Sequence, residues 1–262
     1  MIPRAHIVAW RKIAPWQSNE QVEQDLVISR ALVEIYSDDL LRSALAFRGA
    51  TVLHKLYLQP AIRYSEDIDL VQTKAEPIGE ILDRLRERLV FLGSPKVRQK
   101  ERSNTMIFSF DSEIAPSIPM KLKLEVNCRE HFAVFGWKLM PYAIESRWFT
   151  GQCELTTFEL EELLGSKLRA LYQRKKGRDI FDLWYALKNA SVDSAKVIEA
   201  FYTYMQAVDC KVTRRQFQEN VSNKLTDRDF GGDVTGLLRA GIQFNKEEAF
   251  ELVNANLVDK MV

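Results

Sequence analysis

The hydrophobic pattern changes its period near residue 150, and this change restricts the possible folds more than any other feature of the sequence. Before this point, residues 63–71 and 120–128 alternate apolar and polar side chains with the period of two that is typical of β-strands. After it, apolar residues recur every three or four positions, as they do on one face of an α-helix. We therefore predict an α+β domain over residues 1–150, followed by a helical domain over residues 151–262.

Local patterns divide these two parts further. The first part should contain a helix over residues 20–46 with a break at Ser37-Asp38, a short apolar piece at 45–47, a turn at 48–50 and a helix at 51–58. A strand (63–71), a helix (77–93) and two strands (102–110 and 120–128) follow. In the second part we expect helices at 156–174, 178–190, 194–208, 213–225 and 245–258.

Composition excludes several classes of protein. The chain has 262 residues, 46% of them hydrophobic, and its formal net charge of +1 gives no overall field that would attract nucleic acid, so any such contact needs a local basic patch. Three widely spaced cysteines indicate a reducing compartment, and the three histidines suggest no zinc site. We find no signal peptide and no apolar run near the ~18 residues of a membrane span. We expect a soluble cytoplasmic protein.

The stretch RYSEDIDLV, residues 63–71, combines a strand pattern with like charges. Period two places Arg63, Ser65, Asp67 and Asp69 on one face. A half-buried strand with one wet face would explain this pattern. However, two carboxylates at positions i and i+2 repel each other, and a divalent cation would remove that cost.

The stretch MKLKLEVNC, residues 120–128, raises the same question. Its polar face carries Lys121, Lys123 and Glu125. If this strand pairs beside residues 63–71, Glu125 becomes a third carboxylate near Asp67 and Asp69, a set that suits Mg²⁺. Two such ions, roughly 3.5–4 Å apart, hold the attacking and leaving oxygens of a phosphoryl displacement. An amphipathic edge strand would explain Glu125 equally well.

A glycine turn precedes the acidic strand. In FRGATVLHK, Gly49 stands at the start of a short helix, where backbone N–H groups favour phosphate. Thr51 could serve as the helix N-cap or as a phosphate donor. A glycine before a helix is common, so the position of this turn in a strand–turn–helix–strand unit carries more weight than the glycine itself.

The first helix of the second part carries a lysine on its apolar face. Thr156 and Glu159 form a plausible capping box, and Lys167 lies on the stripe formed by the leucines that follow. The lysine either snorkels to water or binds an anionic ligand in a cleft. In both cases Lys167→Met should be neutral or slightly stabilising, and only in the second should activity fall. Asp179 and Asp182 lie in the first turn of the next helix, where acidic residues are ordinary.

Together, FRGATVLHKLYLQPAIRYSEDIDLV and KLRALYQRKKGRDIFDLW resemble the AbiEii/AbiGii toxin family of nucleotidyltransferases, which includes the MenT toxins. The resemblance covers about residues 45–187 and is expected to continue through the helical tail. It implies a DNA polymerase β-like nucleotidyltransferase fold followed by a helical domain, and an enzyme that uses Mg²⁺ and an NTP. It also implies transfer of NMP to an RNA acceptor, the tRNA 3′ end, and a cognate antitoxin.

The resemblance assigns roles to individual positions. The family's glycine-turn motif falls on Gly49 and Thr51, with Lys55 after them, and its second glycine is here Ala50. The family's acidic motif falls on Ser65, Asp67 and Asp69, its third carboxylate on Glu125, and the lysine and acidic residue of its helical motif on Lys167 and Asp182, with Asp179 beside them. This implies Asp67, Asp69, Lys167 and Asp182 as catalytic residues, Asp67, Asp69 and Glu125 at the metal, and Ser65 and Lys167 at the phosphates. We place Arg63 at the phosphates as well, because it shares the predicted strand face of Ser65.

Two other functions remain open. The enzyme could act on a small molecule or a protein as a nucleotidyl- or phosphotransferase, or the chain could bind NTP or a partner protein without catalysis. Residues 174–178, Arg214 and Arg215 are candidate RNA contacts, although charges in solvated loops are common.

Overall fold

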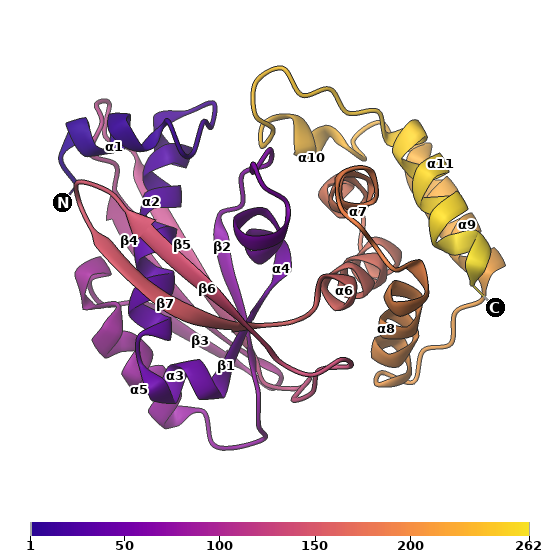
Figure 1. Cartoon of the computed structure of the whole chain (residues 1–262), viewed down its shortest axis with the longest axis horizontal. Coiled ribbons are helices and arrows are strands. Elements are labelled where there is room, and N and C mark those ends of the chain that lie inside the picture. Colours follow the sequence, from indigo (N-terminus) through magenta and orange to yellow (C-terminus); the bar gives the residue numbers. More distant parts are fainter. Residues whose placement is uncertain (1, 262) are drawn as a thin grey trace. The chain divides into compact units, whose positions relative to one another are not determined.

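The computed structural model describes residues 2–261 and contains two compact units (Figure 1). Unit 1 comprises residues 1–56 and 63–158, and unit 2 comprises residues 57–62 and 159–262. The division therefore follows Phe158 and does not lie near residue 150. The expectation that the chain is helical from residue 151 onward is wrong, because Thr150–Thr157 forms strand β7 of unit 1.

Unit 1 is built on a mixed five-stranded sheet with the order β1-β2-β5-β4-β3 (Figure 1). β2 and β5 are parallel, and the other neighbours are antiparallel. The strands are β1 (Leu45–Arg48), β2 (Asp67–Gln72), β3 (Lys96–Lys100), β4 (Ser103–Asp111) and β5 (Pro119–Asn127). The two longest strands, β4 and β5, and the acidic strand β2 were predicted, whereas β3 was missed because its residues are mostly exposed and polar.

A β-hairpin and a long helix complete the core of unit 1. The hairpin joins β6 (Lys138–Glu145) to β7, and helix α2 (Asn19–Tyr36) contacts both the hairpin and β5. The approach is close: a Cβ on Gly151 would lie 2.8 Å from Val33 Cγ1. The predicted capping box at Thr156 is wrong, because its hydroxyl lies in β7 and donates a hydrogen bond of 2.6 Å to the Arg42 carbonyl.

The helices of unit 1 follow local capping signals. The Ser18 hydroxyl accepts from Gln21 N in a capping box that starts α2. The predicted break after this helix is confirmed, since α2 ends at Tyr36 and the Asp38 side chain caps the next helix. The other helices are α1 (Arg4–Trp10), α3 (Asp39–Ala44), α4 (Gly49–Val52), which continues as a π-helical turn at Leu53–Tyr57, and α5 (Gly79–Arg88), which is followed by a 3-10 turn at Val90–Leu92.

Unit 2 is helical. Its predicted helices are present as α6 (Leu160–Gln173), α7 (Gly177–Asn189), α8 (Ser194–Gln206), α9 (Arg214–Leu225) and α11 (Lys246–Asn256), with two short pieces, α10 (Gly232–Thr235) and a 3-10 turn at Val258–Lys260. α6 packs on α8 where Gly165 permits close approach, since a Cβ there would lie 2.6 Å from Ala200 Cβ. Segment 57–62 belongs to this unit because Ile62 is buried against Phe181, Val234 and Leu238.

No helix within residues 2–261 is long and apolar enough to cross a lipid bilayer.

Candidate active site

Two neighbouring strands of unit 1 bring four charged side chains onto one face of the sheet. β2 and β5 run side by side with Asp67 opposite Lys123 and Asp69 opposite Glu125. All four side chains are partly exposed, whereas the residues between them are buried: Ile68, Leu70, Leu122, Leu124 and Val126. The strand pairing that would place Glu125 beside Asp69 is therefore confirmed.

Arg63 and Ser65 do not share this strand face. β2 begins at Asp67, so the alternation predicted from residue 63 onward is wrong for the first four positions. The Arg63 side chain is 1% exposed, and its Nη1 donates to the Tyr64 carbonyl at 3.1 Å. A buried guanidinium that bonds to its own chain supports the entry to the strand and is not displayed on the face of the carboxylates.

The glycine turn lies directly against the second aspartate. Gly49 has φ +86°, a conformation that side chains rarely adopt. A Cβ at this position would lie 2.4 Å from Asp69 Oδ2. Glycine is therefore required twice, by the backbone conformation and by the approach of the carboxylate. The predicted strand–turn–helix–strand unit is confirmed as β1–Gly49–α4–β2.

Thr51 has a different role from the N-cap that the sequence suggested. The residue before α4 is Arg48, and it makes no side-chain cap. The Thr51 side chain is buried, donates to the Asp67 carbonyl at 2.5 Å and lies 2.8 Å from the Ser65 hydroxyl oxygen. This hydroxyl therefore fixes α4 to the start of β2 and so positions the first aspartate.

Lys123 is a charged residue of this face to which the alternating pattern assigned no role. Its ammonium lies 2.6 Å from Glu125 Oε2. Burial alone would lower the pKa of Lys123, but its bond to Glu125 and the charges of Glu125, Asp67 and Asp69 outweigh burial and raise it. The face therefore carries three carboxylates with one ammonium of the chain among them.

The three carboxylates of this face are the side chains that would hold the metal that the sequence suggested. Within residues 2–261, no group of three or more Asp, Glu, His or Cys side chains is arranged to hold a metal ion. The chemistry of the face nonetheless fits a hard cation, since Asp67, Asp69 and Glu125 offer only oxygen ligands. The Lys123 ammonium bonds to one of these carboxylates.

Lys55, which follows the glycine turn, points to a different set of partners. Its Nζ lies 3.2 Å from each carboxylate oxygen of Asp25 and donates to Ser29 Oγ at 2.9 Å. The same carboxylate accepts the indole N–H groups of Trp10 and Trp16. Lys55 therefore fastens the π-helical turn to α2.

Unit 2 contains its own cluster of charges. Lys167 Nζ lies 3.2 Å from Asp179 Oδ1 and 2.9 Å from Asp182 Oδ2. Arg174 binds both oxygens of Asp179, at 2.6 and 2.8 Å. Both aspartates have 0% exposure and Lys167 has 5%, so the snorkelling interpretation is wrong. Burial raises the pKa of Asp179, but the charge of Lys167 and the bond and charge of Arg174 lower it by more.

Most of the basic residues considered for RNA contact have partners within unit 2. Arg174 pairs with Asp179, and Lys175 pairs with Asp227. The Arg215 side chain pairs with Glu219 one turn along α9, and Arg214 Nη1 donates to the Asp259 carbonyl. The three ion pairs reduce the positive charge that this part of the chain offers to an external phosphate.

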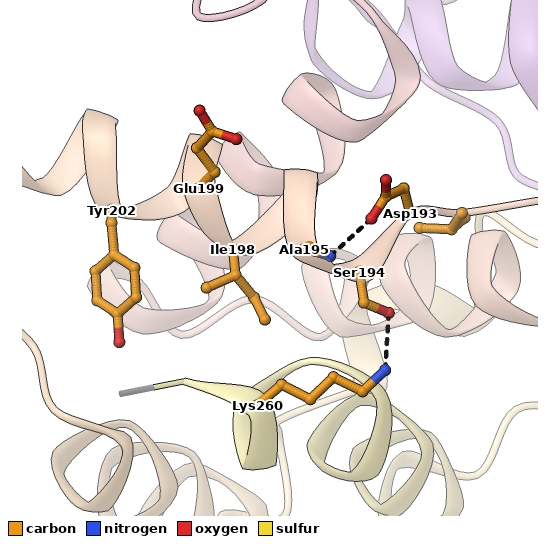
Figure 2. Close-up of a pocket in the computed structure, with 8 residues that line it drawn as sticks. Asp193, Ser194, Ala195, Ile198, Glu199, Tyr202 and Lys260 are labelled. Carbon is orange, nitrogen blue, oxygen red and sulfur yellow. Dashed lines mark hydrogen bonds between the residues drawn. The ribbon is translucent and has the colours of Figure 1, made fainter.

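A surface pocket of about 670 Å³ lies on unit 2, beside the start of α8 (Figure 2). Lys260 Nζ donates to Ser194 Oγ at 3.3 Å across it, and Asp193 Oδ1 accepts from Ala195 N at 2.9 Å. Its described lining contains none of the predicted site residues, and the aspartate already occupies the helix N-terminus.

Comparisons with known proteins identify the family and the fold. Residues 30–252 match the family model described as "Nucleotidyl transferase AbiEii toxin, Type IV TA system". A search of curated proteins gave no match. Among solved structures, a putative nucleotidyltransferase from Helicobacter pylori is 20% identical with a TM-score of 0.57, covering 93% of this chain and 96% of its own. MenT4, a nucleotidyltransferase toxin from Mycobacterium tuberculosis H37Rv, is 14% identical with a TM-score of 0.59, covering 98% of this chain and 100% of its own.

The two structural likenesses show the fold, and the predicted α+β nucleotidyltransferase fold is confirmed by them and by the mixed sheet. The family match covers most of the chain, including both the carboxylate face and the buried charge cluster. The chain therefore belongs to the AbiEii family of nucleotidyltransferase toxins of type IV toxin–antitoxin systems.

Proposed function

We propose that this nucleotidyltransferase transfers a nucleoside monophosphate from an NTP to an RNA acceptor, the 3′ end of tRNA, with Mg²⁺ as cofactor. One observation carries the proposal: the register of β2 on β5 places Asp67, Asp69 and Glu125 on one partly exposed face, with Gly49 against Asp69. The cytoplasm supplies both substrates, and we place the reaction there.

Asp67, Asp69 and Glu125 would hold the metal. Bound there, Mg²⁺ would neutralise charge on phosphate oxygens and lower the pKa of the attacking hydroxyl. The 3′-hydroxyl oxygen forms a bond to the α-phosphorus, the bond to pyrophosphate breaks, and pyrophosphate leaves with the bonding electrons while the hydroxyl proton passes to water. No histidine is needed as a base in this scheme.

The glycine turn would receive the triphosphate. The backbone at Gly49 comes close to Asp69, and the Ser65 hydroxyl lies near the first residue of β2. Ala50 replaces a second glycine here, and its Cβ limits how closely the backbone approaches the phosphates. Thr51 and Arg63 contribute by holding this backbone in place, through the bonds described above.

We propose Lys167 as a further ligand of the triphosphate, with Asp182 as the residue that orients it. An ammonium has three N–H donors, and the structure engages Lys167 with two carboxylates. Such pairing fixes the direction of the side chain, as a phosphate ligand requires. Asp179 of α7 and Arg174, at the C-terminal end of α6, stabilise the same arrangement.

A second acceptor class has specific support. Because several candidate RNA-binding residues are paired within unit 2, a small molecule or a protein remains a candidate acceptor. A non-catalytic role is less consistent with the complete set of carboxylates on the β2–β5 face.

The acceptor is identified by labelling. The protein is incubated with each α-³²P-labelled NTP and Mg²⁺, together with total RNA, a protein extract or a small-molecule extract in separate reactions. Label at the 3′ end of tRNA supports the proposal, whereas label only in protein or small molecules supports the alternative. Binding to RNA should also weaken steeply with salt.

The toxin's partner is tested in cells. Expression without the cognate antitoxin should slow bacterial growth, and Asp69→Ala at the same protein level should relieve it. Unimpeded growth with abundant wild-type protein would contradict a toxic RNA-directed activity.

A further inference from the structure

We propose that Lys123 is an internal counter-ion of the carboxylate face, which pairs with Glu125 and competes with a divalent cation that binds there. This inference rests on the proposed metal dependence and adds a positioning residue to that site. It makes metal binding an exchange of one cation for another.

The register of the two strands supplies the first argument. Lys123 stands directly opposite Asp67 and two residues before Glu125 on the same strand, so it shares one face with all three carboxylates. Its ammonium is 2.6 Å from Glu125 Oε2. A divalent cation that binds this oxygen of Glu125 competes with the ammonium for it.

The charge balance supplies the second argument. Where β2 and β5 pair, three carboxylates and one ammonium leave this face with a deficit of positive charge, and like charges on neighbouring strand positions destabilise a sheet. Arg48 stands opposite Asp69 on the other side, but its Nη1 bonds to Glu130 at 2.8 Å. Lys123 is therefore the cation that lies opposite and between the acidic positions of β2 and β5.

Exposure supplies the third argument. The side chain of Lys123 is 40% exposed and that of Glu125 is 36% exposed. Both can therefore change rotamer without opening the core, and the released ammonium can be solvated. A fully buried pair, such as the one in unit 2, would resist such an exchange.

Two simpler roles predict different results. If the Lys123–Glu125 pair only stabilises the strand, its removal should leave metal affinity unchanged. If Lys123 helps to build the metal site, its removal should weaken metal binding. Only a competing counter-ion predicts that metal binds more tightly when the lysine is absent.

The test is a calorimetric titration of the full chain with Mg²⁺, without nucleotide. Lys123→Met should bind Mg²⁺ at least about threefold more tightly than wild type. Lys121→Met is the matched control, because Lys121 is a lysine on the same face of the same strand, before the pairing with β2 begins, and it should equal wild type. Lys123→Arg retains the charge and should stay near wild type.

A second measurement uses wild-type protein alone, so it does not depend on a variant that folds. Acetic anhydride labelling of lysines, followed by mass spectrometry, should modify Lys123 more in Mg²⁺ than in EDTA, with Lys121 unchanged. Equal affinities of Lys123→Met and wild type, weaker binding by the variant, or unchanged labelling of Lys123 would overturn the inference alone. Failure of wild-type protein to bind Mg²⁺ would overturn the proposed metal dependence as well.

Discussion

Replacing Lys167 by methionine should destabilise unit 2, contrary to what the helical pattern suggests. In the structure Lys167 and Arg174 balance two aspartates that have no exposed surface. Methionine packs well on an apolar stripe but removes one of the two positive charges. Breaking a buried pair by removing one partner costs about 3–5 kcal/mol, because a carboxylate loses its compensation in a low-dielectric interior. The melting temperature should therefore fall by about 6–20 °C.

The assay is a double-mutant cycle followed by chemical and thermal unfolding. Lys167→Met and Asp182→Asn should each destabilise unit 2, and the double variant should lose less than the sum of the two, because it restores the charge balance. The Lys167–Asp182 distance of 2.9 Å makes this coupling specific. A Lys167→Met protein as stable as wild type would refute the buried-cluster account and restore the snorkelling interpretation.

Three further predictions follow from single contacts. Gly49→Ala should reduce transfer at least tenfold and lower the unfolding free energy by about 1–3 kcal/mol, because the new Cβ would meet Asp69 and the φ of residue 49 is positive. Gly79→Ala is the control: its Cβ would enter open space, so this variant should be neutral or slightly stabilising. Burial raises the pKa of Asp179, but its basic partners lower it by more. The ionised Asp179 carboxylate should therefore contribute its full stability above about pH 4, and this contribution should be lost as the pH falls through the lower folded-state pKa. The stability of Asp179→Asn, measured by unfolding between about pH 2 and 5, should lack this dependence. Burial raises the pKa of the Cys153 thiol to about 12, so iodoacetamide at about pH 8 should alkylate it at least about 100-fold more slowly than glutathione, as mass spectrometry can measure.

The sequence was informative where one element decides the outcome. Alternation placed Asp67 and Asp69 on one face of their strand and Glu125 on one face of another strand. In the structure these two strands, β2 and β5, are neighbours. The helices of unit 2 were predicted because each carries its own apolar stripe. Such patterns depend on the backbone geometry of a single segment and need no knowledge of its neighbours.

The sequence was uninformative where distant residues decide. A helical wheel shows that Lys167 faces the core but cannot show that Asp179 and Asp182 of the next helix meet it there. Thr156 matches a capping box locally, yet the hairpin places it in β7, where its hydroxyl bonds to α3. Ile62 joins unit 2 through contacts with residues more than a hundred positions away, which no local pattern records.

The most direct test of the central claim is nucleotide transfer by variants of the carboxylate face. Asp67→Asn and Asp69→Asn remove charge but keep side-chain size, and Asp111→Asn, at the exposed end of β4, is the control. With α-³²P-labelled NTP, Mg²⁺ and total RNA, we predict that wild type and Asp111→Asn label RNA, whereas both face variants fold normally and lose transfer. Full RNA labelling by Asp67→Asn and Asp69→Asn would contradict the account.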